Sequence, residues 1–276
     1  LVAGLAERAL QALGEGAVEL LAEADRVART HLVPQQLETS RVLPLALLDR
    51  CHALALQAAA GRTISAEAVQ WVTTHRAARL HQAEVAVLEA LARLTRYLDG
   101  AEEEAGDVVA QVRAYQRHGA FADLAMMQLR RALAGSALYH AEVEAVLRAA
   151  QERRDQGNLR FAQTLARGYE AALHREGLTP LHRLWKRQVA PLWQDGVVPL
   201  YLVVLDGCSY PVFLELLNAL SQDSGFPVGI RPDKEGRVAG LPALAPLPTI
   251  TSHARGALFL GEMPGDSLIA ETTYRE

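Results

Sequence analysis

The acidic residue Asp206 follows directly after a short apolar run. Residues 200–205 are Leu, Tyr and Val in successive positions, a pattern typical of a central parallel strand that is covered on both faces. Open α/β sheets bind their ligands at the carboxyl ends of such strands, and Gly207 lets a ligand approach the backbone closely. We therefore expect Asp206 to be a metal ligand. The alternative, given equal weight, is that Asp206 caps the following helix.

A second group of polar residues precedes an apolar segment that should form a helix over residues 252–260. Thr251 is expected at the amino end of this helix, where unpaired N–H groups and the helix dipole favour an anion. Arg255, four residues later, can donate two hydrogen bonds to the same anion, and Ser252 is expected to help bind it. Capping by Thr249, Thr251 and Ser252 explains the hydroxyl groups equally well, but it does not explain the arginine.

These two segments together resemble a known family. Residues 202–207 and 247–262 look like the start of a PglZ domain, a branch of the alkaline phosphatase superfamily found in phage-exclusion (BREX or Pgl) defence systems. The superfamily pattern is a strand ending in a metal-binding Asp, then a turn with two hydroxyl residues, and then a helix that ends at a Gly. Asp206 matches the metal ligand, Thr251 matches the nucleophile that also contacts metal, and Thr249 matches the structural hydroxyl residue.

The resemblance implies a phosphoric ester hydrolase that uses two divalent ions, Zn²⁺ or Mn²⁺, with Thr251 as nucleophile and Asp206 and Thr251 as metal ligands. Arg255 has the implied roles of catalytic and substrate-binding residue, together with Ser252. The same turn is similar to the sulfatase signature, in which Cys or Ser precedes Arg by four residues. Sulfatases oxidise that Cys or Ser, and a threonine cannot replace it, so the resemblance favours a phosphoester substrate over a sulfate ester.

The superfamily completes its metal site with Asp and His residues far downstream of the nucleophile. His253 and Asp266 lie too close to Thr251 to match them. We therefore expect the chain to be a fragment of a longer enzyme, and we expect this fragment alone to be inactive. One carboxylate and one hydroxyl are too few ligands to hold a metal tightly.

The expected partners are other subunits of a phage-defence complex, with nucleic acid as a further candidate. DNA, a nucleotide and a phosphoprotein all remain open as the natural substrate. A non-catalytic alternative is that the chain works as a helical interaction module or scaffold in such a complex. Arginines between residues 153 and 175 could form a basic face, but acidic residues are interleaved among them, so a solvated face is the favoured interpretation.

The composition divides the chain into two regions, an all-α region over residues 1–195 and the start of an α/β core over residues 196–276. Ala, Leu, Glu, Arg and Gln dominate the first region, which is the profile of strong helix formers. The fold class is therefore mixed, with helices followed by an alkaline-phosphatase-like sheet domain.

Periodicity and turn residues predict the individual elements. Ser65 is expected to cap the longest helix, along which Leu80, Val87, Leu91, Leu94 and Leu98 form one apolar seam. Glycines at 119, 157 and 177 are expected to separate later helices. The remaining predictions are helices at 108–115, 120–133, 136–154, 158–173, 181–193 and 212–221, a strand at 226–230, and an irregular segment at 241–248.

The bulk composition excludes several classes of protein. The net charge of −4 over 276 residues does not indicate nucleic-acid binding through overall charge. The two cysteines have no CxxC spacing, which argues against a disulfide framework and favours a reducing, cytoplasmic setting. No apolar run approaches the roughly 20 residues that span a bilayer, so we expect no membrane partner.

Overall fold

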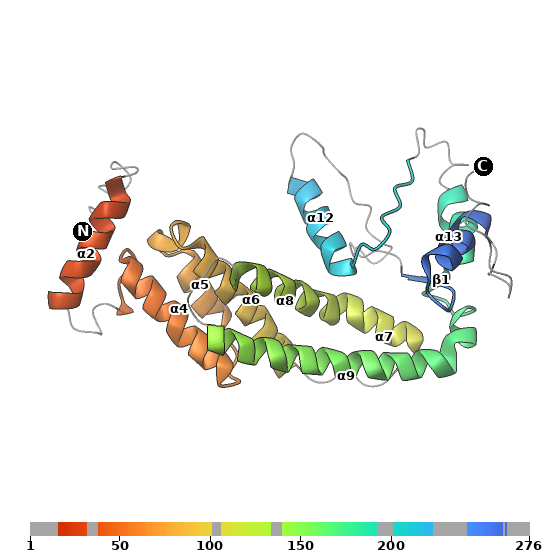
Figure 1. Cartoon of the computed structure of the whole chain (residues 1–276), viewed down its shortest axis with the longest axis horizontal. Helices are drawn as coiled ribbons and strands as arrows, with labels where there is room; N and C mark the ends of the chain where they lie inside the picture. Colours follow the sequence, from red (N-terminus) through yellow and green to blue (C-terminus); the bar gives the residue numbers. More distant parts are fainter. Residues whose placement is uncertain are drawn as a thin grey trace. The chain divides into compact units, whose positions relative to one another are not determined.

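The computed structural model describes residues 16–31, 38–100, 106–133, 140–191, 201–222, 242–261 and 263 (Figure 1). The chain divides into two compact units, each built from two segments. Unit 1 combines Leu1–Glu102 with Phe121–Asp155, and unit 2 combines Glu103–Ala120 with Gln156–Glu276. The predicted boundary between residues 195 and 196 lies outside the described residues.

The described part of the chain is mostly helical, which confirms the prediction of a helical amino-terminal region. The helices are α2 (Gly16–His31), α4 (Pro44–Ala59), α5 (Ala66–Thr73), α6 (Gln82–Asp99), α7 (Val108–Ala114), α8 (Ala120–Leu133), α9 (His140–Ala172), α10 (Leu181–Leu184), α12 (Tyr210–Gln222) and α13 (Thr251–Leu260). Three short elements link some of them: the 3₁₀ helix η1 (Arg76–Arg79) and the π-helical turns η2 (Tyr115–Gly119) and η3 (Trp185–Val189).

Ser65 caps a helix as predicted, because its Oγ accepts a hydrogen bond from the Ala68 N–H at 3.1 Å. The predicted single long helix after it is wrong. The chain forms α5, η1 and α6 in succession, because His75 has extended backbone angles and its side chain caps η1. Histidine is an uncommon cap, so the pattern of apolar residues gave no sign of this break.

Two predicted breaks at glycine are also wrong. Gly157 lies inside α9, which runs unbroken for 33 residues. Gly119 lies in η2, which joins α7 to α8 without leaving the helical region of backbone angles. A glycine costs only about 1 kcal/mol relative to alanine in a helix interior, and the strong helix formers on both sides outweigh that cost.

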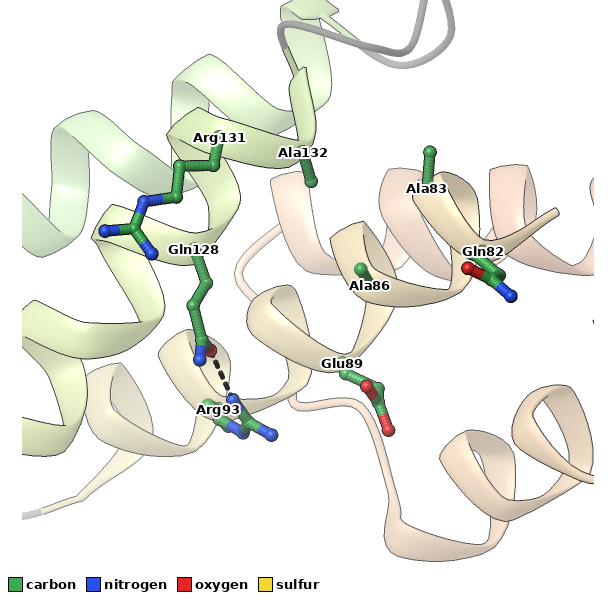
Figure 2. Close-up of a pocket in the computed structure, with 8 residues that line it drawn as sticks. All are labelled: Gln82, Ala83, Ala86, Glu89, Arg93, Gln128, Arg131 and Ala132. Carbon is green, nitrogen blue, oxygen red and sulfur yellow. Dashed lines mark hydrogen bonds between the residues drawn. The ribbon is translucent and has the colours of Figure 1, made fainter. Parts of the chain in front are cut away.

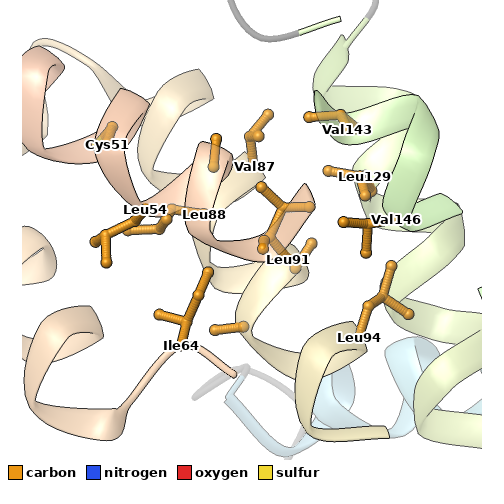
Figure 3. Packing of buried hydrophobic residues seen from close by; sticks show 14 of the residues in the cluster. Cys51, Leu54, Ile64, Val87, Leu88, Leu91, Leu94, Leu129, Val143 and Val146 are labelled. Atoms are coloured by element: carbon orange, nitrogen blue, oxygen red, sulfur yellow. The ribbon is translucent and has the colours of Figure 1, made fainter. Parts of the chain in front are cut away.

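The core of unit 1 is a single hydrophobic cluster (Figure 3). The predicted seam supplies its centre, since Val87, Leu91 and Leu94 of α6 are each at most 1% exposed. Leu98 packs against this cluster, whereas Leu80 precedes α6 and is 47% exposed. Other large buried members are Leu47 and Leu54 of α4, Ile64, Val72 of α5, Leu129 of α8, and Val143 and Val146 of α9.

Unit 2 has a smaller cluster around a minimal sheet. Strand β1 (Thr179–Pro180) pairs in parallel with β2 (Ala243–Leu244), with Thr179 opposite Ala243. The Tyr169 hydroxyl donates a hydrogen bond to the Ala245 carbonyl at 3.1 Å, which ties α9 to the segment after β2. Apart from β2, residues 242–248 are irregular, as their prolines predict.

The predicted central strand at residues 200–205 is wrong for the part that the structure describes. Residues 201–205 form no strand, and their side chains are exposed, with Tyr201 at 82% and Val203 at 75%. A strand needs a neighbour for its backbone hydrogen bonds, and no described residue pairs with this segment. The predicted strand at 226–230 lies outside the described residues.

A buried histidine, His75, joins two segments of unit 1. Its Nδ1 accepts a hydrogen bond from the Ala77 N–H, and its Nε2 lies 3.1 Å from the Ser40 carbonyl oxygen. The neutral tautomer protonated at Nε2 satisfies both contacts. Burial lowers the pKa of His75; the hydrogen bond to Ser40 opposes this, while Arg41 and His81 add to it.

The lowered pKa predicts that unit 1 loses stability in acid. The unfolded chain takes up the proton near the ordinary histidine pKa of about 6.5, while folded His75 stays neutral to lower pH. The unfolding free energy should therefore fall as pH drops below about 6.5, by at most about 1.4 kcal/mol per pH unit. Urea unfolding at several pH values measures this change.

The control variants compare a buried histidine with an exposed one. His75→Gln should remove this part of the pH dependence, whereas His31→Gln, at an exposed position on α2, should leave it intact. Equal pH dependence in wild type and His75→Gln would contradict the prediction.

Candidate functional site

Two residues predicted to act together lie in contact in unit 2. The Arg255 Nη2 donates a hydrogen bond to the Asp206 Oδ2 at 3.0 Å, across 49 residues of sequence. Both side chains are about half exposed, at 51% and 57%. An ion pair this exposed adds little to stability, but it fixes where the arginine and the acid lie relative to each other.

The surroundings of Asp206 disagree with the capping alternative. Helix α12 begins at Tyr210, four residues after Asp206, so Asp206 is too early in the chain to be its N-cap. Gly207 has a φ of +70°, a left-handed conformation that glycine adopts without strain. A Cβ at that position would meet nothing within 4 Å, so the turn needs glycine for its backbone angle and not for space.

Thr251 is the first residue of α13, close to its predicted position. The N-cap is Ile250, which has no side-chain hydrogen bond to the helix. Ile250 therefore provides no side-chain cap for the first turn of α13, and Thr251 beside it is exposed. This arrangement suits an anion better than it suits the capping interpretation.

The next two residues of α13 are less exposed than Thr251. Ser252 and His253 are both half-buried. The His253 Nδ1 is buried and has no hydrogen-bond partner among the described residues. Ser252 therefore lies where it was predicted, next to Thr251, and the structure adds the ring of His253, which the sequence pattern considered only as a metal ligand and rejected.

Helix α13 is held in place by α10, against which it packs. It ends at Gly261 as predicted, with a φ of +72°. A Cβ at Gly261 would lie 3.5 Å from the His182 carbonyl oxygen, which shows how closely the end of α13 approaches α10. Burial lowers the pKa of His182, and the positive charges of Arg183 and Arg187 lower it further.

The described residues do not form a complete metal site. Among them, no group of three or more His, Cys, Asp or Glu side chains is placed to hold a metal ion. Asp206 and Thr251 supply one carboxylate and one hydroxyl, whereas protein-bound zinc takes three or four ligands. These two residues alone therefore do not fit the pair of ions that the resemblance implies.

Other features of the described residues are poorer candidates for a catalytic site. A groove between α6 and α8, with a volume of about 500 Å³, has alanines at 83, 86 and 132 in its wall and an Arg93–Gln128 hydrogen bond across it (Figure 2). The described residues of its lining include no Ser, Thr, Cys or His side chain, and the one acidic residue among them is Glu89. Cys51 is buried, and burial raises the pKa of its thiol to about 12, so the thiolate is scarce at neutral pH.

Sequence reasoning missed one part of unit 2 that bears on binding. Trp185 is 44% exposed on η3, next to exposed Lys186 and Arg187. The cluster of one tryptophan and three cations at residues 183–187 was the available signal.

No described helix combines the length and the apolar character needed to cross a bilayer. Comparison of the chain with protein-family models, with curated proteins and with solved structures found no match. A proposal for the function of the chain therefore depends on the chemistry of the residues around Asp206 and Thr251.

Proposed function

We propose that this chain supplies the nucleophile and anion-binding part of a phosphoesterase of the PglZ type, acting in bacterial anti-phage defence. The observation that carries the proposal is the contact between Arg255 and Asp206. It brings together two motifs that are distant in sequence and that the resemblance assigns to one active site. Chance pairing of an acid with a base is common on surfaces, but here each partner belongs to a motif chosen for its chemistry.

The chemistry assigned to α13 follows from its amino end. A phosphate oxygen at this position would receive hydrogen bonds from N–H groups of the first turn, and the helix dipole favours its negative charge. Arg255, one turn along the same helix, has a planar guanidinium group that matches two oxygens of a phosphate. Thr251 then presents its hydroxyl beside the bound phosphorus as the nucleophile.

Asp206 acts as a positioning residue for Arg255 in this proposal. Its carboxylate holds the guanidinium group near the start of α13 before substrate arrives. A bound phosphate would compete with that carboxylate for the same donors, and the exposed pair can exchange partners at small cost. The resemblance also gives Asp206 a metal, and such an ion needs further ligands besides Asp206 and Thr251.

A second candidate function is a helical scaffold in a defence complex without catalysis. The small number of metal ligands among the described residues favours this candidate. The large helical core of unit 1 is consistent with it, because such a body offers stable faces for partner subunits. The cytoplasmic setting and the defence subunits expected as partners belong equally to both candidates.

Hydrolysis of bis-p-nitrophenyl phosphate with added Zn²⁺ or Mn²⁺ tests the enzymatic candidate. The assay compares the full-length wild-type protein with its Thr251→Ala and Asp206→Ala variants, and EDTA removes the metal as a further arm. We expect metal-dependent hydrolysis that Thr251→Ala lowers about a thousandfold or more, because it removes the nucleophile, and that Asp206→Ala lowers at least about tenfold, because it removes the carboxylate that positions Arg255. Hydrolysis that neither substitution changes would rule out the site, and absence of hydrolysis in the wild type would favour the scaffold.

A further inference from the structure

An exposed tryptophan lies within a cluster of cations in unit 2. Trp185 is 44% exposed, and Lys186 and Arg187 beside it are exposed as well. Tryptophan is rarely left this open to water, because burying its large ring is strongly favourable. Tryptophan is enriched at interfaces, where its ring contacts a partner and its N–H can meet water.

The local backbone sets this tryptophan in an unusual element. Residues Trp185–Val189 form the π-helical turn η3, which continues directly from α10. Turns of this kind are rare and occur frequently at functional sites. Arg183 and Arg187 are four residues apart and share one helix face with Lys186. Trp185 lies on a different face, next to Lys186 in sequence, so a flexible strand that contacts both must follow the helix surface around from the ring to the cations.

The charged residues of this segment are all basic. No acidic residue occurs between Glu176 and Asp195. Burial is the largest cause that lowers the pKa of His182. The charged groups that lower it further are all basic, namely Arg183, Arg187 and His174. Among the described residues, neither Lys186 nor Arg187 forms an ion pair with a carboxylate. The two cations are therefore available to an anionic partner.

The position of this surface links it to the candidate site. Helix α10 packs against α13, whose first turn carries Thr251 and which also carries Arg255. In Figure 1, α13 is the blue helix near the carboxyl end of the described chain. A polyanion held along α10 and η3 therefore lies on the element that supports the proposed phosphate-binding helix.

We propose that Trp185, together with Lys186, Arg187 and Arg183, binds single-stranded nucleic acid, with a base stacked on the indole ring and the backbone phosphates on the cations. A single strand fits better than a duplex, because the base faces of a duplex are already stacked on each other. If the bound strand is also the substrate, the inference rests on the proposed function. Binding of the strand is nevertheless measured separately, under conditions in which no hydrolysis occurs.

Fluorescence anisotropy of a fluorescein-labelled 15-nucleotide oligo(dT), in EDTA so that no hydrolysis occurs, tests the surface. Trp185→Ala should weaken binding about five- to a hundredfold, the range that stacking of one base provides. Trp185→Phe should retain most of the affinity, because it keeps an aromatic face. Inorganic polyphosphate, which has no bases, should bind wild type and Trp185→Ala equally.

The cations are tested by the salt dependence of the same binding. The double variant Lys186→Gln, Arg187→Gln should lower the slope of log K against log salt by about 1.4, from about 0.7 for each lost phosphate contact on a single strand. The double variant Arg50→Gln, Arg62→Gln removes the same charge from exposed positions of unit 1 and should leave the slope unchanged. Far-UV circular dichroism checks that each variant is folded.

Several outcomes would overturn the inference. One is that Trp185→Ala binds oligo(dT) as tightly as wild type, and another is that it loses polyphosphate binding as much as oligo(dT) binding. The others are that wild type binds a duplex of the same length more tightly than the single strand, or that it does not bind oligo(dT) at all. Lost or absent binding with normal bis-p-nitrophenyl phosphate hydrolysis would overturn this inference alone. Normal binding with no hydrolysis would overturn only the proposed catalytic function.

Discussion

Replacing Thr251 by alanine is expected to lower kcat for bis-p-nitrophenyl phosphate by about a thousandfold or more, since loss of an enzymatic nucleophile has effects of this size. The substitution removes the hydroxyl that would attack phosphorus and leaves the helix end intact. Substrate binding should change much less, because the N–H groups of α13 and the Arg255 side chain remain. The loss should therefore appear in kcat with KM nearly constant.

Two matched variants separate a nucleophile from a structural threonine. Thr251→Ser keeps a hydroxyl at the same position and should retain measurable turnover. Thr249→Ala removes the other threonine of the same turn, which the resemblance makes structural, and should lower kcat far less than Thr251→Ala. Thr251 is exposed, so its loss should leave the unfolding free energy nearly unchanged. Equal kcat for Thr249→Ala and Thr251→Ala would contradict the assignment.

The parts of the fold that sequence predicted well depend on neighbouring residues. Ser65 has its capping hydrogen bond, and the Val87, Leu91 and Leu94 seam is buried. Helix α13 ends at Gly261, as the glycine predicts. In each case the signal and the structure lie within one or two helical turns, so a short window of sequence contains the physical cause.

The wrong predictions concern features that depend on contacts between residues distant in sequence, or on a small local cost that other interactions outweigh. Residues 201–205 have the composition of a buried strand, but burial needs a neighbouring strand, which composition does not supply. Gly157 inside α9 carries a small cost that the whole helix outweighs. The break after α5 depends on the ring of His75 accepting a backbone hydrogen bond.

The candidate site shows the same division. The sequence selected Asp206, Thr251, Ser252 and Arg255 by motif, and the place of the last three in the first half of α13 follows from local pattern. Asp206 was expected at the end of a strand, and it lies in a turn instead. The contact between Arg255 and Asp206 could not be predicted from sequence spacing. The two residues are 49 positions apart, and only the folded structure shows that they meet. The sequence had assigned Arg255 only to a bound anion.

The second large effect concerns the core of unit 1. Leu91→Ala is expected to lower the unfolding free energy by about 2–5 kcal/mol, the range for a leucine truncated in a packed interior. Leu91 is fully buried at the middle of α6, within the cluster that includes residues of α4, α5, α8 and α9. Neighbours held by several separate elements cannot all move inward, so a cavity should remain where the side chain was.

Urea unfolding measured through Trp71 checks this expectation, because Trp71 packs against the same cluster. The measurement needs Trp185→Phe and Trp193→Phe as background, so that the signal reports on unit 1 and not on a transition of unit 2. Leu56→Ala is the matched control: Leu56 lies on α4 with 46% exposure and should cost at most about 1 kcal/mol. The midpoint should shift while the slope with urea stays constant, since the surface exposed on unfolding hardly changes. If the two variants lost equal stability, α6 would not be the centre of the core, and the helices that surround it would have to be packed in another way.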